Sequence, residues 1–242
     1  MGRIRLNKFI ALSGLTSRRK ADALIEEGRV EVNGKVVTKL GTLVDPYKDK
    51  VRVDGRIVAP PKKDVYLAFN KPKGYVTTMD DELGRKSIAT LFYNFPVRIF
   101  PVGRLDMDTE GLIFLTNDGE FSYIVTHPKF NIEKEYNVWA EGKVTEEDLK
   151  KLKKGVFIDG KIVRPKIVEI LKHDRKNTMI KVIITEGRKR EIRRMFHHIG
   201  HKVERLVRIR IGPVKLGDLR SGKYRDLTPS EVEWFFQKKG GK

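Results

Sequence analysis

The stretch of residues 103–119 places the strongest constraint on how this chain can fold. Three carboxylates at alternate positions are followed by an apolar run at residues 112–115, and the run ends at an Asn-Asp-Gly turn. A short apolar run closed by such a turn predicts a buried strand. A charged loop that leads into a buried strand can hold a reactive carboxylate rigidly, so we place the chemistry of the protein in this stretch.

Residues 1–60 have the pattern of a small α/β module. Apolar side chains at helical spacing predict one helix that ends at Gly14 and a second over residues 18–27, with Ser17 as its N-cap. Residues 29–37 alternate between apolar and polar side chains and are interrupted by Asn-Gly, the most typical sequence of a tight β-hairpin. Two helices followed by a hairpin predict a compact N-terminal domain.

A larger second domain is expected over residues 64–242, after a proline-containing linker at residues 56–64. Its strands outnumber its helices and do not alternate with them regularly. This pattern favours an α+β fold with a mostly antiparallel mixed sheet flanked by helices. The expected strands lie at residues 65–70, 112–115, 134–140, 165–171, 178–185 and 203–211. The expected helices lie at residues 120–126, 145–153, 190–199 and 228–236.

The composition favours a polyanionic partner. The chain has 51 lysines and arginines against 32 acidic residues, which gives a formal net charge of +19 and makes nucleic acid the expected partner. The absence of cysteine excludes disulfides, thiolate-bound metals and thiol nucleophiles. No apolar run approaches the roughly 18 residues that span a bilayer, so we expect a cytoplasmic protein without a membrane partner.

The second predicted helix begins with Ser-Arg-Arg-Lys, which puts three cations at the positive end of the helix dipole. An RNA phosphate would stabilise this arrangement. The order of a helix, a Ser-Arg-Arg-Lys helix and an Asn-Gly hairpin resembles the S-four-type RNA-binding module. The resemblance implies that six residues contact RNA: Arg5, Lys8, Ser17, Arg18, Arg19 and Lys20.

The alternating carboxylates Asp106, Asp108 and Glu110 could bind a cation, because hard metal ions require several oxygen ligands. A calcium loop of the EF-hand type that started at Asp106 would need a bidentate glutamate at its twelfth position, where the chain has Asn117. We therefore expect no metal here. The alternative is a single carboxylate that acts as a nucleophile or general base and is kept ionised by nearby cations.

Four segments together resemble signature sequences of the bacterial ribosomal RNA pseudouridine synthases of the RsuA/RluB type. This family joins an S-four-type module to a catalytic domain, which implies domains at residues 1–60 and 64–242. The last segment is more similar to the large-subunit (RluB-type) enzymes. The segments are Asn-Lys-Pro-Lys-Gly (70–74), the stretch 103–119 that begins Gly-Arg-Leu-Asp, Lys-Glu-Tyr (134–136), and Glu-Gly-Arg-Lys-Arg-Glu-Ile-Arg-Arg-Met (186–195).

The resemblance implies that the protein isomerises a specific uridine of large-subunit ribosomal RNA to pseudouridine, without a cofactor or metal. It assigns Asp106 as the catalytic carboxylate, Tyr136 as the tyrosine that stacks on the target base, and Arg193 as the ion-pair partner of Asp106. Three further residues are implied to bind the substrate: Arg104, Leu206 and Lys71. The resemblance does not decide whether Asp106 attacks the ribose covalently or removes a proton from it.

The implied partner is ribosomal RNA or a ribosome-assembly intermediate, and we expect a monomer.

Two other functions are compatible with these sequence features. One is a non-catalytic S-four-type RNA-binding or ribosome-assembly factor, although the presence of Asp106, Tyr136 and Arg193 together argues against it. The other is a metal-dependent nuclease that uses Asp106, Asp108 and Glu110.

Overall fold

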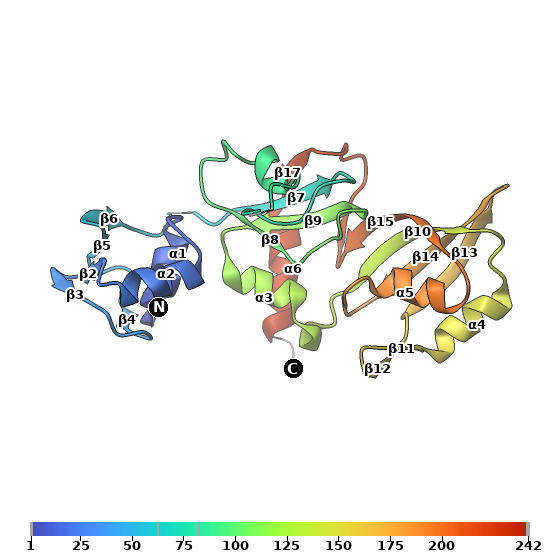
Figure 1. The fold of residues 1–242 in the computed structure, drawn as a ribbon, viewed down its shortest axis with the longest axis horizontal. Helices are drawn as coiled ribbons and strands as arrows, with labels where there is room; N and C mark the ends of the chain where they lie inside the picture. Colours follow the sequence, from blue (N-terminus) through green and yellow to red (C-terminus); the bar gives the residue numbers. More distant parts are fainter. Residues whose placement is uncertain (1, 62, 82, 241–242) are drawn as a thin grey trace. The chain divides into compact units, whose positions relative to one another are not determined.

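The chain divides into two compact units (Figure 1). The computed structural model describes residues 2–61, 63–81 and 83–240. The first unit comprises Met1–Val65 and Asn94–Ile99, and the second comprises Tyr66–Tyr93 and Phe100–Lys242. Both units contain helices and strands, and the sheet of the larger unit is mostly antiparallel. The predicted α+β fold, with a small N-terminal module and a larger second domain, is confirmed.

Two helices and two small sheets form the first unit. Helices α1 (Leu6–Leu12) and α2 (Arg18–Glu26) pack around a core of apolar side chains. The hydroxyl of Ser17 accepts a hydrogen bond from the backbone N–H of Lys20 at 3.2 Å, so the predicted N-cap is confirmed. The strands are β1 (Ile4–Arg5), β2 (Val30–Val32), β3 (Lys35–Val36), β4 (Leu43–Val44), β5 (Val51–Val53) and β6 (Arg56–Val58).

Two tight hairpins follow α2 in the chain. Asn33 and Gly34 have φ angles of 53° and 80°, as expected for the Asn-Gly turn between β2 and β3. Asp54 and Gly55 repeat this geometry between β5 and β6, with φ angles of 49° and 75°. The prediction that residues 56–64 are a linker is therefore wrong for its first three residues, because the Asp-Gly turn returns the chain to the sheet.

One nine-stranded sheet organises the second unit, in the order β13-β14-β10-β15-β9-β7-β17, with β16 beside β15 and β8 beside β9. Its paired strands are antiparallel except for β9 and β15, which run parallel. All six predicted strands are confirmed. The strands are β7 (Tyr66–Lys71), β8 (Phe100–Val102), β9 (Glu110–Thr116), β10 (Lys134–Glu141), β13 (Ile167–His173), β14 (Asn177–Ile184), β15 (Val203–Ile211), β16 (Val214–Lys215) and β17 (Tyr224–Asp226). A separate hairpin pairs β11 (Val156–Ile158) with β12 (Lys161–Val163).

Four helices of the second unit begin and end close to the predicted positions. They are α3 (Gly119–Thr126), α4 (Glu146–Lys154), α5 (Glu191–His198) and α6 (Pro229–Gly240), with short 3-10 turns at Ile88–Leu91 and Pro128–Phe130. Two of these helices begin with a capping box: Thr145 and Asp148 cap α4 reciprocally, and Thr228 and Glu231 do the same for α6. None of the helices in the described part of the chain is long and apolar enough to cross a membrane.

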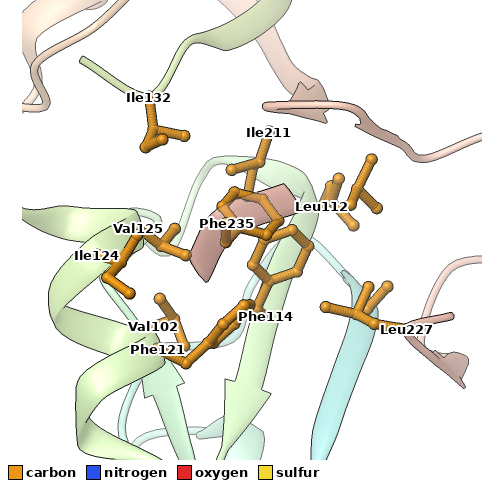
Figure 2. Packing of buried hydrophobic residues seen from close by; sticks show 12 residues of the cluster. Val102, Leu112, Phe114, Phe121, Ile124, Val125, Ile132, Ile211, Leu227 and Phe235 are labelled. Carbon is orange, nitrogen blue, oxygen red and sulfur yellow. The ribbon is translucent and has the colours of Figure 1, made fainter. Parts of the chain in front are cut away.

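The core of the second unit fixes strand β9 against helices α3 and α6 (Figures 1 and 2). Phe114 of β9, Phe121 of α3 and Phe235 of α6 are fully buried, and their ring centroids lie 5.3–5.8 Å apart. Phe235 meets both other rings edge to face, and such contacts add to the stabilisation from burial of the rings. Because β9 follows directly after the carboxylate-bearing loop, this core holds the end of that loop in place.

Gly111 allows the close approach of β9 and β15. Its φ angle is +108°, and a Cβ atom at this position would lie 2.3 Å from the carbonyl oxygen of Arg208 and 2.8 Å from its nitrogen. Both contacts are with backbone atoms, so rotation of a side chain cannot relieve them. Only glycine fits where β9 meets the parallel strand β15.

We expect Gly111→Ala to lower the free energy of unfolding by about 1–3 kcal/mol or more, because it adds a backbone clash to an unfavourable φ angle. Urea denaturation measures the change. Gly119→Ala is the matched control, because Gly119 begins α3 and has open space around its Cβ position. Equal stability of the two variants would contradict the assigned role of Gly111.

Candidate active site

A cavity of about 280 Å³ lies in the second unit, where the loop before β9 meets β10, β15 and the start of α5. Four of the predicted site residues line it, although they are far apart in the sequence: Arg104, Asp106, Tyr136 and Leu206. The cavity therefore combines a carboxylate, an aromatic ring, a cation and an apolar wall. A concave site that combines polar groups with an apolar wall suits a small ligand.

A second cavity, of about 650 Å³, shares five lining residues with the first: Arg104, Leu105, Asp106, Lys189 and Arg190. Its lining also includes Arg85 and Asp108, so cations outnumber carboxylates there. The side chain of Asp106 is 37% exposed and lies where the two cavities meet. A polyanionic chain bound in the second cavity would thus place one of its units next to the Asp106 carboxylate.

Lys71 does not line either cavity, so the prediction that it binds the substrate does not fit its position. Its side chain is fully buried, and its ammonium donates to the carbonyl oxygens of Pro72 at 3.1 Å, Asp106 at 3.2 Å and Thr109 at 2.8 Å. These hydrogen bonds fix both ends of the turn that carries Asp106. Lys71 therefore fixes the backbone of the turn that carries Asp106.

Burial lowers the pKa of Lys71 from 10.5 to about 8, although the charge of Asp106 opposes this shift. Two further contacts support the same loop. The backbone N–H of Gly74 donates to the carbonyl oxygen of Met107 at 2.7 Å, and the Thr77 hydroxyl donates to that of Leu105 at 2.6 Å. The loop is thus held by the segment that follows β7.

Arg193 pairs with Asp108 and not with Asp106, so the predicted ion pair is wrong in this structure. Its Nε lies 3.3 Å from Asp108 Oδ2, and its two Nη atoms donate to the backbone oxygens of Asp108 at 2.9 Å and Val203 at 2.7 Å. These hydrogen bonds hold the Arg193 guanidinium beside Asp108. Burial lowers the pKa of Arg193, and the attraction of Asp108 opposes that effect.

Arg190 is the cation next to Asp106. Its Nη1 lies 4.0 Å from Asp106 Oδ2, and its guanidinium also donates to both oxygens of Asp108 at 3.2–3.3 Å. Arg190 immediately precedes α5 and has a φ angle of +52°, which is unusual for a residue with a side chain and is often found at functional sites. Asp108 therefore organises two arginines beside Asp106.

The three alternating carboxylates do not converge on one point. Glu110 pairs with Arg205 at 2.7 Å, whereas Asp108 pairs with Arg190 and Arg193. Among residues 2–61, 63–81 and 83–240, no group of three or more His, Asp or Glu side chains could hold a metal ion. Within these residues, the geometry gives no support to the nuclease alternative.

Arg208 is a site residue that the sequence did not reveal. It is buried on β15 directly opposite Tyr136 of β10, and its Nη1 donates to the Tyr136 hydroxyl at 3.3 Å. Its Nε donates to the carbonyl oxygen of Leu112 at 2.6 Å. The period of a strand could have indicated it, because residues two apart share a face and Leu206 was already assigned to the pocket.

Lys134 and Glu191 also line the first cavity, and neither was predicted as a site residue. Burial lowers the pKa of Lys134 to about 8, and its ammonium donates to the carbonyl oxygens of Ile132 and Thr185. Glu191 is buried at the start of α5 and accepts from the backbone N–H of Arg188 at 2.6 Å. Burial raises the pKa of Glu191.

The six residues predicted to bind RNA lie in the first unit. The side chain of Ser17 caps α2, so its hydroxyl has a structural role. The other five are exposed, on β1, α1 and the first turn of α2: Arg5, Lys8, Arg18, Arg19 and Lys20. The three cations predicted at the start of a helix are thus presented to solvent there.

Comparisons with known proteins connect both units to families. Residues 65–198 match the RNA pseudouridylate synthase family, and residues 4–46 match the S4 domain. The chain is 44% identical over 231 residues to the ribosomal large subunit pseudouridine synthase B of Bacillus subtilis, which covers 95% of this chain and 94% of that protein. It is 45% identical over 241 residues to a protein of Aquifex aeolicus described as an uncharacterized RNA pseudouridine synthase, covering 99% and 96% of the two chains.

A solved structure shares the same architecture. The crystal structure of a pseudouridylate synthase superposes with a TM-score of 0.67 at 33% sequence identity, covering 96% of this chain and 99% of that chain. The similarity therefore extends over both units.

The buried ammonium of Lys71 predicts a pH-dependent contribution to stability. Between pH 8 and 10.5 the unfolded chain keeps the lysine proton that the folded protein has lost, so stability rises with pH. We expect the free energy of unfolding of the wild type, minus that of Lys71→Met, to rise by up to about 3 kcal/mol across this range. Urea denaturation from pH 7 to 10.5 measures the difference, and a flat difference would contradict the burial of a charged lysine.

Proposed function

Because the chain belongs to the RNA pseudouridylate synthase family and also carries an S4 domain, we propose that it isomerises a specific uridine of large-subunit ribosomal RNA. The observation that carries the proposal is the cavity that places Asp106 beside Tyr136 and Leu206. The name of the Bacillus subtilis relative supports the choice of the large subunit. We further propose that residues 1–60 bind RNA and that residues 64–242 form the catalytic domain.

The reaction rearranges a single nucleotide. The bond between N1 of uracil and C1′ of ribose breaks, the base rotates, and a bond forms between C5 and C1′. The C5 proton leaves and N1 gains a proton, so the atoms of uridine and pseudouridine balance without an oxidant, a reductant or a co-reactant. The protein must therefore supply a carboxylate, hold the free base and keep water away from it.

Asp106 is the carboxylate in this proposal, and it acts at the ribose either as a nucleophile or as a base. The Arg190 guanidinium lies 4.0 Å from this carboxylate. Arg193 and Asp108 form the ion pair that keeps the start of α5 against the Asp106 loop. We assign Arg193 a positioning role, together with Lys71, in place of direct contact with Asp106.

The size of the first cavity limits what can enter. A volume of about 280 Å³ is just below the range of roughly 300–1,000 Å³ for small-ligand pockets, so the cavity can take a single nucleoside but not a helical RNA segment. The target uridine must therefore be flipped out of its stack. In this proposal Tyr136 stacks on the base, Leu206 forms the apolar wall, and Arg104 contacts the nucleotide where the two cavities meet.

We expect Asp106→Asn to reduce pseudouridine formation by more than about 1,000-fold, because the amide cannot act as nucleophile or base, while RNA binding persists. Tritium release from ribosomal RNA labelled at C5 of uridine measures the activity. Glu110→Gln, at the start of β9, is the matched control, since Glu110 pairs only with Arg205 among the described ion pairs. Near-wild-type release by Asp106→Asn would refute the proposal. If the protein were a purely RNA-binding factor, neither the wild type nor any variant would release tritium.

The double variant Arg18→Ala with Arg19→Ala should weaken RNA binding and reduce its salt dependence. If both cations contact phosphates, the slope of log K against log salt becomes shallower by about 1.4–1.8. Binding titrations at several salt concentrations measure the slope. Arg52→Ala with Arg56→Ala removes the same charge from exposed positions on β5 and β6 and serves as the control. An unchanged slope for the first variant rules out phosphate contacts there.

A further inference from the structure

Unpaired polar atoms are concentrated in the first cavity. Among the described residues, five buried side-chain nitrogen or oxygen atoms make no hydrogen bond, and three of these five belong to residues that line this cavity. The three are Thr109 Oγ1, Glu191 Oε1 and Arg208 Nη2, on side chains that are at least 96% buried. Buried polar atoms without partners are rare and costly, so their concentration at one wall indicates a polar ligand.

The remaining polar atoms of Glu191 and Arg208 are already bound by the protein. Glu191 Oε2 accepts from the backbone N–H of Arg188 at 2.6 Å. Arg208 Nε donates to the carbonyl oxygen of Leu112 at 2.6 Å, and Nη1 donates to the Tyr136 hydroxyl at 3.3 Å. The two side chains are thus fixed in place, and each has one group left: an acceptor at Glu191 Oε1 and a donor at Arg208 Nη2.

One acceptor and one donor are the groups that the polar edge of uracil can pair with. Its N3–H donates and lies between two carbonyl oxygens, O2 and O4, which accept. The isomerisation requires the free base to turn so that C5 takes the place of N1. A half-turn about the axis through N3 and C6 does this, and it exchanges O2 with O4 while N3–H stays in place. One acceptor and one donor can therefore hold the base both before and after the turn.

We propose that Glu191 and Arg208 hold the uracil edge throughout the reaction, with Glu191 Oε1 accepting from N3–H and Arg208 Nη2 donating to the adjacent carbonyl oxygen. This inference rests on the proposed function and adds the residues that recognise the base. The pair also selects uracil over cytosine. In cytosine, N3 has a lone pair that repels Glu191 Oε1, and an amino group replaces O4, one of the two oxygens that face Arg208 in turn.

The test changes the acceptor into a donor. In Glu191→Gln the amide oxygen can still accept from the Arg188 N–H, whereas the amide nitrogen takes the place of Oε1 and donates. This variant is combined with Asp106→Asn to prevent turnover. The probes are three RNA stem–loops that contain the target site, with uridine, cytidine or 3-methyluridine at the target position. Mapping of pseudouridines in ribosomal RNA from strains with and without the gene identifies that position.

We expect Asp106→Asn alone to bind the uridine stem–loop at least about tenfold more tightly than the cytidine or 3-methyluridine stem–loops. Addition of Glu191→Gln should reduce the uridine-to-cytidine affinity ratio by about tenfold or more. Glu186→Gln is the matched control, because Glu186 is half exposed, pairs with Arg188 and does not line the cavity. It should leave the ratio unchanged.

An equal loss of affinity for uridine and cytidine in Glu191→Gln would assign Glu191 a structural role and overturn the inference. Tight binding of 3-methyluridine by Asp106→Asn alone would overturn it without any change at Glu191. Arg208→Lys should also reduce the uridine-to-cytidine ratio, and an unchanged ratio would exclude Arg208 from base recognition. If a target uridine is mapped, these outcomes leave the proposed function intact. If no uridine depends on the gene, the proposed function fails and this inference fails with it.

Discussion

The parallel contact between β9 and β15 is the constraint on which the candidate site depends. It is only two residues long, pairing Val207 with Glu110 and Arg208 with Gly111. On one side of this contact are β9, its core helices and the loop with Asp106; on the other are β15, β10 with Tyr136, and α5 with its arginines. The cavity lies where the two halves meet. A glycine at 111 lets the backbones come close enough for both halves to contribute.

Two of the three alternating carboxylates have close ion-pair partners, and the third is the exception. Asp108 binds Arg190 and Arg193, and Glu110 binds Arg205, so these carboxylates are neutralised by close partners. Asp106 has its nearest described cation at 4.0 Å and remains partly exposed. Lys71 holds Asp106 through its backbone carbonyl oxygen, so the side-chain carboxylate of Asp106 stays available for a ligand. The structural ion pairs therefore leave one acid free for chemistry.

Much of the fold could be predicted from the sequence because the signals were local. Asn33-Gly34, the Ser17 cap and the capping boxes each act within four residues, and the long strands have clear periods. Strands of two or three residues, such as β16 and β17, carry no period and were missed. The family resemblance predicted that one site contains Asp106, Tyr136, Arg104 and Leu206. It could not tell which carboxylate Arg193 would reach, because that choice depends on the path of the backbone between two distant segments.

The position of the last elements has a consequence for biosynthesis. Strand β7 pairs with β17, so that Leu67 lies opposite Asp226, and Phe235 of α6 completes the core around β9. Contacts between residues so distant in sequence form slowly and cannot form until the C-terminal segment has left the ribosome. The helices and hairpins of the first unit, in contrast, join residues that are close together. The RNA-binding unit can therefore fold on the nascent chain well before the cavity around Asp106 is complete.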